Sequence, residues 1–225
     1  MDIIERASPN ANDRPAGACI DMVILHYTGM KTGKAALERL CDADTGVSAH
    51  YLIDEDGTTY RMVAEARRAW HAGSSHWSGA ADINDRSLGI EIVNPGHVFG
   101  YRAFPETQMQ SVEVLLAEVV ARHHVPPSRV VGHSDIAPTR KQDPGELFDW
   151  KRLADKGLSI WPEAPGDAGD PADAPGRLAE IGYDPKAPLT DVVTAFQRRF
   201  VPAGVNGMLD QDTLAAIAAV HVLNG

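Results

Sequence analysis

The sequence predicts an α/β protein in which a central mixed β-sheet is flanked by helices and is followed by a small helical bundle. Apolar or alternating runs that end in turn residues are typical of strands, and stripes of period 3.6 are typical of helices. The two patterns are interleaved along most of the chain, which favours an α/β layer structure. The C-terminal residues show helical stripes alone, which predicts the bundle.

Three segments predict the strands of the sheet. DMVILHYTG (residues 21–29) is an apolar run that stops at a turn signal, so we expect a buried strand that ends near His26. SAHYLIDEDGTTYRMV (48–63) has two apolar stretches joined by Asp-Gly, which predicts a hairpin. SLGIEIVN (87–94) alternates apolar with other residues and places Glu91 among isoleucine and valine.

Helical periodicity predicts one long helix before the tail and two within it. Residues 105–125 carry an apolar stripe made of Met109, Val112, Leu116 and Val119 or Val120. The first tail helix carries a stripe made of Leu189, Val192, Val193, Phe196 and Phe200. The second follows an Asp-Gln-Asp-Thr start that can cap it, and its stripe is Leu214, Ile217 and Val220.

A change in composition predicts the domain boundary. WPEAPGDAGDPADAPG (161–176) is rich in proline, glycine, alanine and aspartate and has almost nothing to bury, as is typical of a linker. We therefore expect a larger domain at residues 1–160, a linker at 161–176 and a helical domain at 177–225.

Composition and charge exclude several classes of partner. The 225 residues carry a formal net charge of -10, which argues against binding to nucleic acid or to an anionic membrane. No apolar run approaches the ~20 residues that span a bilayer. The N-terminus MDIIERASPNANDRP has charges where a signal peptide has an apolar region, so we expect a cytoplasmic protein. Cys19 and Cys41 are expected to be reduced thiols, and the protein to be a monomer.

The segment GHSDIAPTRKQDPG (132–145) contains the strongest candidates for chemistry. Its turn residues rule out a periodic core element, yet it contains His133, Lys141 and Asp143. With His26 at a strand end, these residues make a His-His-Asp set, and zinc in hydrolases uses three such ligands plus a water. Lys141 would stabilise an oxyanion near the metal, and Glu91, with its pKa raised by burial, would accept the proton of the water.

Spacing alone leaves a structural interpretation open for each of these residues. A lone histidine in a strand is more often a satisfied core residue than a ligand. Lys141 and Asp143 could form a solvated ion pair, and a buried Glu91 would then need a salt-bridge partner. The sequence has no HExxH and no paired CxxC that would decide the matter.

Five motifs, in this order, resemble a known family. They are LHYTG, SAHYLID, AWHAGSS, NDRSLGIEIVNPG and GHSDIAPTRKQDPGELFDW, within residues 20–161. Together they closely resemble the zinc-dependent N-acetylmuramoyl-L-alanine amidases of the AmpD/AmiD kind, the amidase-2 family. KGLSIWPEAP resembles the AmiD branch. The tail segments GRLAEIGYDP, VVTAFQRRF and GMLDQDTLAAI look like a three-helix peptidoglycan-binding domain.

The resemblance implies an amidase fold, one Zn²⁺ per chain and an activity. His26, His133 and Asp143 fall on the family's zinc ligands, and Glu91 and Lys141 fall on its catalytic positions. The reaction implied is hydrolysis of the amide between N-acetylmuramic acid, or its 1,6-anhydro form, and L-alanine in peptidoglycan or muropeptides.

Further residues are expected around the groove. His71 and Asn84 match family positions that meet the substrate, and Trp70 could stack on a sugar ring or simply pack. His50 is expected to be structural or to lie in the groove wall. His76 is expected at the surface, and the histidines at 97, 123, 124 and 221 are expected to be solvated. Ser134 and Asp135 are expected to bond local backbone.

Two other classes of function compete with the zinc amidase. A non-catalytic, zinc-containing peptidoglycan-recognition module would have lost ligands, whereas this chain has all of them. A metal-stabilised structural protein would need a fourth protein ligand, for which Cys41 is the one candidate considered. The compartment also has an alternative, because the periplasm would follow if a leader was removed and the cytosol would suit recycled 1,6-anhydro-muropeptides.

Overall fold

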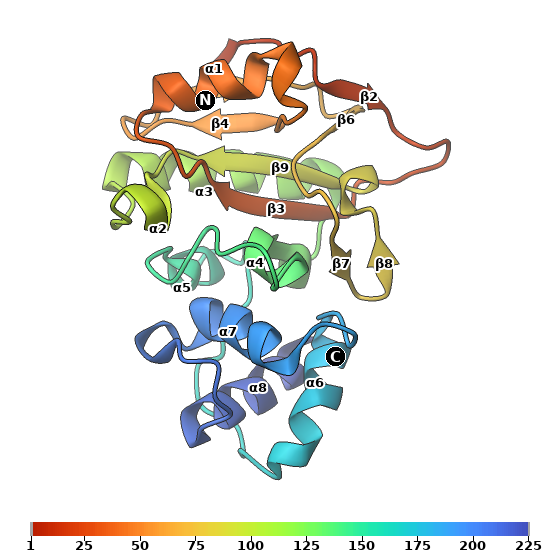
Figure 1. Ribbon diagram of the computed structural model, residues 1–225, viewed down its shortest axis with the longest axis vertical. Coiled ribbons are helices and arrows are strands. Elements are labelled where there is room, and N and C mark those ends of the chain that lie inside the picture. Colours follow the sequence, from red (N-terminus) through yellow and green to blue (C-terminus); the bar gives the residue numbers. More distant parts are fainter. Residues whose placement is uncertain (1, 225) are drawn as a thin grey trace.

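The computed structural model describes residues 2–224, and its centre is a mixed β-sheet (Figure 1). Six strands lie in the order β1-β5-β4-β9-β3-β10. β4 and β5 are antiparallel and the other neighbouring pairs are parallel, so the predicted mixed sheet is confirmed. The strands are β1 (Ile3–Glu5), β3 (Met22–Tyr27), β4 (Tyr51–Ile53), β5 (Thr59–Arg61), β9 (Ser87–Ile92) and β10 (Val130–Gly132).

The remaining elements lie around this sheet. Two short antiparallel ladders are formed by β2 (Ala11–Asp13) with β6 (Arg67–Ala69) and by β7 (His76–Trp77) with β8 (Ala80–Ala81). The helices before the tail are α1 (Gly33–Cys41), α2 (Gly96–Phe99), α3 (Glu106–His123), α4 (His133–Ile136) and α5 (Trp150–Ala154). Within residues 2–224 no helix combines the length and the apolar character needed to cross a bilayer.

Helix α3 covers one face of the sheet, as its predicted stripe requires. Met109, Val112 and Leu116 are buried in one apolar cluster with alternate residues of β3 and β9, among them Leu25 and Ile90. Because successive side chains of a strand point to opposite faces, His26 and Glu91 lie on the face away from α3. The two residues are also direct neighbours in the parallel β3–β9 register. The fold thus brings both candidates together near the C-terminal ends of adjacent strands.

The face that carries His26 and Glu91 is covered in two places. On the β4 side, Ala36 and Leu40 of α1 pack against Leu52. On the β10 side, Ile136 of α4 shares a cluster with Ile24 of β3. A groove between the two covers lies beside the ends of the parallel strands, the edge at which α/β proteins commonly bind ligands.

The segment 132–145 is not a loop throughout. His133 opens the single-turn helix α4, because Oδ2 of Asp135 accepts a hydrogen bond from the backbone N–H of Gly132 at 2.8 Å. The expectation that this whole segment avoids regular structure is therefore wrong at its start. The remainder folds back, so that the backbone N–H of Ser134 donates to the carbonyl oxygen of Asp143 at 2.9 Å.

The tail forms three helices, as predicted: α6 (Ala174–Ile181), α7 (Leu189–Phe200) and α8 (Gln211–Asn224). Both predicted stripes are buried except for Leu189, which is 40% exposed. Asp210 caps α8 by accepting from the backbone N–H of Thr213 at 2.9 Å. Helix α6 begins at Ala174, so the predicted linker 161–176 includes its first residues.

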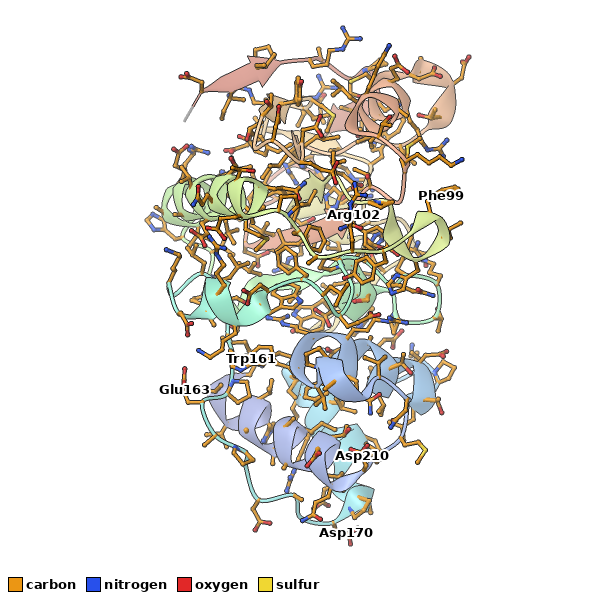
Figure 2. All side chains as sticks on the ribbon, turned by 90° about the vertical axis from the view of Figure 1, so that its left-hand side faces the viewer. Phe99, Arg102, Trp161, Glu163, Asp170 and Asp210 are labelled. Atoms are coloured by element: carbon orange, nitrogen blue, oxygen red, sulfur yellow. The ribbon has the colours of Figure 1, made fainter. Side chains whose placement is uncertain are left out.

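The tail helices pack directly on the rest of the molecule (Figure 1). Val193 and Phe196 of α7 belong to one buried cluster with Met22, Ile24 and Val131 of the sheet. The chain passes from the sheet to the tail at Trp161 (Figure 2). The ring of this residue lies beside that of Phe200, with centroids 6.0 Å apart. The tail and the sheet thus share one hydrophobic core.

Polar contacts reinforce this junction. Asp135, which is expected to bond local backbone, also accepts from Tyr183 of the tail at 2.7 Å and from Nη1 of Arg199 at 3.1 Å. All three side chains are buried. The carboxylate that caps the turn of α4 is therefore paired with a tail residue, and the sequence analysis missed this contact.

Replacing Phe196 with alanine should lower the free energy of unfolding by about 3–5 kcal/mol, because it removes a fully buried aromatic ring from the shared core. Leu189→Ala is the matched control, since Leu189 lies on the same helix but is 40% exposed. Urea unfolding of both variants measures the difference. An equal loss in the two variants would contradict a shared core.

Candidate active site

Two histidines and one aspartate converge on one point of the groove. Nδ1 of His26 lies 2.9 Å from Nδ1 of His133, and each of these nitrogens lies 3.0 Å from Oδ2 of Asp143. His26 is at the end of β3, His133 opens α4, and Asp143 is on the segment that folds back. Among residues 2–224, no other group of three or more His, Cys, Asp or Glu side chains is arranged to hold a metal ion.

Hydrogen bonds fix His133 in the form that a metal needs. Its Nε2 lies 3.1 Å from the carbonyl oxygen of Ala72. A carbonyl can only accept, so Nε2 carries the proton and Nδ1 presents a lone pair. Support of a ligand histidine by a backbone carbonyl is a common feature of metal sites.

His26 is fixed in the same form by a chain of side chains behind it. Its Nε2 lies 3.1 Å from Nδ1 of His71, and Nε2 of His71 lies 3.2 Å from Oγ of Ser87. The Ser87 hydroxyl donates to the carbonyl oxygen of Ile83 at 2.7 Å, so it accepts from His71. Each ring therefore donates through Nε2, and Nδ1 of His26 is left free to bind a cation.

Burial keeps His26 and His71 neutral. It lowers the pKa of His26 to about 4, with the neighbouring His133 acting in the same direction. Burial also lowers the pKa of His71 well below its ordinary value, and the nearby His26 and His50 add to the effect. Neutral imidazole is the form that binds a metal ion.

Asp143 is held as a carboxylate in this buried place. Burial alone would raise its pKa, but the close contacts with the imidazoles of His133 and His26 outweigh that effect and lower it. The site therefore offers two imidazole nitrogens and one anionic oxygen.

This donor set fits zinc. Tetrahedral ligands at the usual ~2.0–2.2 Å from zinc lie about 3.3 Å from one another, close to the 2.9–3.0 Å between these three atoms. Cys41 does not join them, because its thiol lies 3.4 Å from the carbonyl oxygen of Arg6. Structural zinc sites have four protein ligands, whereas catalytic zinc sites have three and keep the fourth position for water. The described residues supply three ligands, so the arrangement matches a catalytic site.

Glu91 lies beside the three ligands with one oxygen uncommitted. The residue as a whole is half-buried, but its Oε2 is buried and has no hydrogen-bond partner among the described residues. Burial raises the pKa of Glu91 well above its ordinary value, and the negative charge of Asp143 raises it further, whereas Lys141 opposes both. A buried carboxylate that is not hydrogen-bonded is costly for folding, so its retention points to a chemical task.

Lys141 lines the same cavity as Glu91 and Asp143, and this cavity has a volume of about 480 Å³.

Arg140, the residue before Lys141, has a structural role. Arg140 donates from Nη2 to the carbonyl oxygen of Ser74 at 2.6 Å and to that of Ala72. Arg140 thus ties the segment that carries Lys141 to the segment that supports His133.

The three residues expected to meet the substrate have different positions. Trp70 lines the cavity, and its indole N–H donates to Asn12 at 2.6 Å. His71 also lines it, but both of its ring nitrogens are engaged behind His26. Asn84 is buried, and its Oδ1 accepts from the backbone N–H groups of His71 and Ala72 at 3.1 and 2.8 Å.

The prediction made from the sequence is confirmed for His50 and is incomplete for His97. His50 is fully buried, and its Nδ1 accepts from the backbone N–H of Gly89 at 3.0 Å, so the expected structural role is confirmed. His97 is more than solvated, because its Nδ1 lies 2.9 Å from the hydroxyl of Tyr27 and both side chains line the cavity. No motif marks His97 in the sequence, since its partners come from distant segments.

Comparison with known proteins gives consistent matches. A family model described as N-acetylmuramoyl-L-alanine amidase matches residues 15–146, which include all eight candidate residues of the site. N-acetylmuramoyl-L-alanine amidase AmiD of Escherichia coli is 37% identical over 229 residues, covering 89% of this chain and 82% of the relative. 1,6-anhydro-N-acetylmuramyl-L-alanine amidase AmpD of Salmonella typhimurium is 39% identical over 107 residues, covering 48% of this chain and 55% of the relative.

The fold has a close counterpart among solved structures. A complex of the E. coli amidase AmiD with anhydro-N-acetylmuramic acid-L-Ala-D-gamma-Glu-L-Lys superposes with a TM-score of 0.81 at 35% identity. The superposition covers 93% of this chain and 91% of that chain. This coverage is too high to omit the tail helices, so the counterpart extends beyond the sheet that carries the site.

Proposed function

This chain belongs to the N-acetylmuramoyl-L-alanine amidase family, and we propose that it is a zinc amidohydrolase that uses one Zn²⁺ per chain. The bond cleaved is the amide between N-acetylmuramic acid, or 1,6-anhydro-N-acetylmuramic acid, and the L-alanine of a stem peptide. The observation that carries the proposal is the convergence of His26, His133 and Asp143 in one cavity with Glu91 and Lys141.

The roles of the chain's own residues follow from their positions. Zinc bound by His26, His133 and Asp143 would polarise the amide carbonyl and lower the pKa of a water at the site. Glu91 accepts the proton of the attacking water through its uncommitted Oε2 and then returns it to the leaving nitrogen of L-alanine. The raised pKa of Glu91 suits a group that must both accept and release a proton near neutral pH.

Lys141 has an electrostatic role in this scheme. As the carbonyl carbon becomes tetrahedral, negative charge builds up on its oxygen, and an ammonium group in a water-excluding cavity stabilises that charge. Lys141 lines the cavity and forms no ion pair with any residue in 2–224, whereas Arg140 donates to backbone carbonyls.

Binding of the substrate is proposed for the groove around these residues. Trp70 lines the cavity with an aromatic face that could pack on a sugar ring. Substrate contacts by His71 and Asn84 remain a proposal. Their hydrogen bonds support a positioning action on the ligand His26 and on the backbone of residues 71–72. We likewise propose a division into a catalytic domain 1–160, a linker 161–176 and a peptidoglycan-binding-like domain 177–225.

The test is the release of free stem peptide from purified muropeptides, with and without a chelator. Intact and 1,6-anhydro forms are compared side by side, and we expect cleavage of the anhydro form, since AmpD carries that substrate in its name and the solved AmiD complex contains it. If the protein binds one zinc per chain but cleaves no muropeptide, the proposal of an enzyme is refuted. The alternative of a non-catalytic peptidoglycan-recognition module then holds. The cytoplasmic location stays a prediction, with the periplasm as its alternative. The monomeric state stays a prediction as well.

Lys141→Met should reduce kcat by about 10²–10³, the usual effect of losing one oxyanion-stabilising group. It should also move the acid limb of the kcat/KM profile to higher pH. Glu91 must be deprotonated to act, and Lys141 is the group that lowers its pKa against the effects of burial and of Asp143. Removing the cation therefore raises the pKa of Glu91.

A pH profile of kcat/KM for both proteins measures this shift. Lys186→Met, in the exposed turn before α7, controls for the loss of a positive charge elsewhere. An acid limb that stays in place in Lys141→Met would remove Lys141 from contact with the charge of Glu91.

A further inference from the structure

A chain of polar contacts joins the tail helix α7 to the wall of the active-site groove. It starts at Tyr27, the residue after the ligand His26, whose hydroxyl lies 2.9 Å from Nδ1 of His97. His97 belongs to α2, the short helix that ends at Phe99 (Figure 2). Tyr27 and His97 both line the cavity that contains Glu91.

The contact made by Nε2 of His97 determines whether Nδ1 donates to or accepts from the hydroxyl of Tyr27. Its Nε2 lies 3.0 and 3.2 Å from the two carboxylate oxygens of Glu146. A carboxylate accepts hydrogen bonds, so Nε2 carries the proton and Nδ1 accepts from the hydroxyl of Tyr27. The ring of His97 is also stacked on Tyr101, with centroids 4.3 Å apart. The imidazole is therefore fixed in both orientation and tautomer.

The carboxylate of Glu146 is held in turn by the tail. Nη1 of Arg198 lies 2.7 Å from Oε2 of Glu146, and it lies 3.5 Å from Nε2 of His97, too far to compete with the carboxylate for that nitrogen. The Arg198 side chain is only 14% exposed. A guanidinium in this position favours the ionised form of Glu146, which is the form that orients His97.

The tail can hold Arg198 in place because the next residue is anchored. Arg199 is buried, and it donates to Asp135 at 3.1 Å and to the carbonyl oxygen of Val130 at 3.1 Å. Arg199 thus attaches α7 to α4, beneath which the helix lies in Figure 1. One position earlier, Arg198 reaches Glu146.

We propose that Arg198 is a positioning residue for the substrate groove, acting through Glu146 and His97 to fix the hydroxyl of Tyr27. This inference rests on the proposed function, and it gives the tail a task at the active site that does not require the tail to bind glycan itself. Arg198 touches neither the ligands nor the cavity, so its effect should fall on substrate binding and not on the chemical step.

The first test is independent of activity. Long-range ¹H–¹⁵N spectra report the tautomer of each neutral histidine, and the His97 signals are assigned by their absence in His97→Gln. We expect the proton on Nε2 in the wild-type protein and a mixture of tautomers in Arg198→Met. An unchanged His97 tautomer in Arg198→Met would overturn the proposal.

The second test uses kinetics on the muropeptide substrate. Arg198→Met should raise KM about three- to tenfold, the effect of loosening one or two hydrogen bonds, with kcat within twofold of wild type. Glu146→Gln should reproduce this change, and the double variant should add little to it because both variants break the same chain of contacts. Arg198→Lys, which keeps the charge, should recover part of the loss.

The matched control is Arg177→Met, because Arg177 is a tail arginine whose ion pair with Asp173 is long, at 3.8 Å, and lies away from the groove. A KM in Arg198→Met equal to that of Arg177→Met would overturn the proposal. A wild-type protein that cleaves no muropeptide would refute the proposed function instead, and the tautomer of His97 would still decide the role of Arg198.

Discussion

Replacing Glu91 with glutamine is expected to lower kcat by about 10²–10⁴, the range that one general acid–base group contributes. Glutamine has nearly the same shape as glutamate but cannot accept a proton from water at neutral pH. Zinc content and melting temperature should remain near those of the wild-type protein, because Glu91 is not among the three converging ligand atoms. The measurement is single-substrate kinetics on a muropeptide beside metal analysis of the same preparations.

The environment of Glu91 explains why this effect should be large. Its Oε2 is buried and makes no hydrogen bond among residues 2–224, so this oxygen is free to accept the proton of the water. Glu55→Gln is a suitable control, since Glu55 is ion-paired with Arg102 outside the cavity. Full activity in Glu91→Gln would remove this residue from the mechanism.

The sequence predicted the strands and the long helix because their signals are local. In SLGIEIVN the alternation of apolar residues reports the two faces of β9 directly, so it also places Glu91 on the face away from α3. The hairpin around Asp-Gly is confirmed for the same reason, since the turn and its flanking strands lie within a few residues. Local patterns of this kind need no knowledge of distant contacts.

The candidate ligand set could be suspected from spacing but not selected by it. His26 and His133 are 107 positions apart, and nothing in either neighbourhood states that the two rings meet. The resemblance of the motifs to a family supplied that pairing, and the structure brings the three atoms to within 3.0 Å of one another.

Contacts between polar residues that are far apart in the chain could not be predicted from the sequence. Asp135 could be assigned a local backbone bond because Gly132 is three residues away, but its pairing with Arg199 joins positions 64 apart. The link from Arg198 through Glu146 to His97 has no periodic signal either. Such pairs depend on which part of the molecule α7 packs against. The hydrophobic stripe of that helix shows only which of its faces is buried.

Removal of the metal should abolish amide hydrolysis and also lower the melting temperature by about 5–11 °C. A ligand present at 100 times its Kd stabilises the folded state by about 2.7 kcal/mol, and a protein of this size gains roughly 2–4 °C for each kcal/mol. The physical reason is the donor set, because two neutral imidazoles and a carboxylate are held within 3.0 Å of one another and a cation satisfies all three at once. Added Zn²⁺ should restore both activity and melting temperature.

A ligand variant separates the two effects of the metal. His133→Ala keeps Asp143 and His26 but removes one donor, so its melting temperature should respond neither to the chelator nor to added Zn²⁺, and its activity should stay at the level of the chelated wild type. Scanning calorimetry and peptide release test this expectation, with both proteins measured untreated, with the chelator and with added Zn²⁺. Activity that survives the chelator while the melting temperature falls would make the metal a purely structural one. Since the described residues supply only three protein ligands, the fourth position is free for water, and we expect activity and melting temperature to fall together.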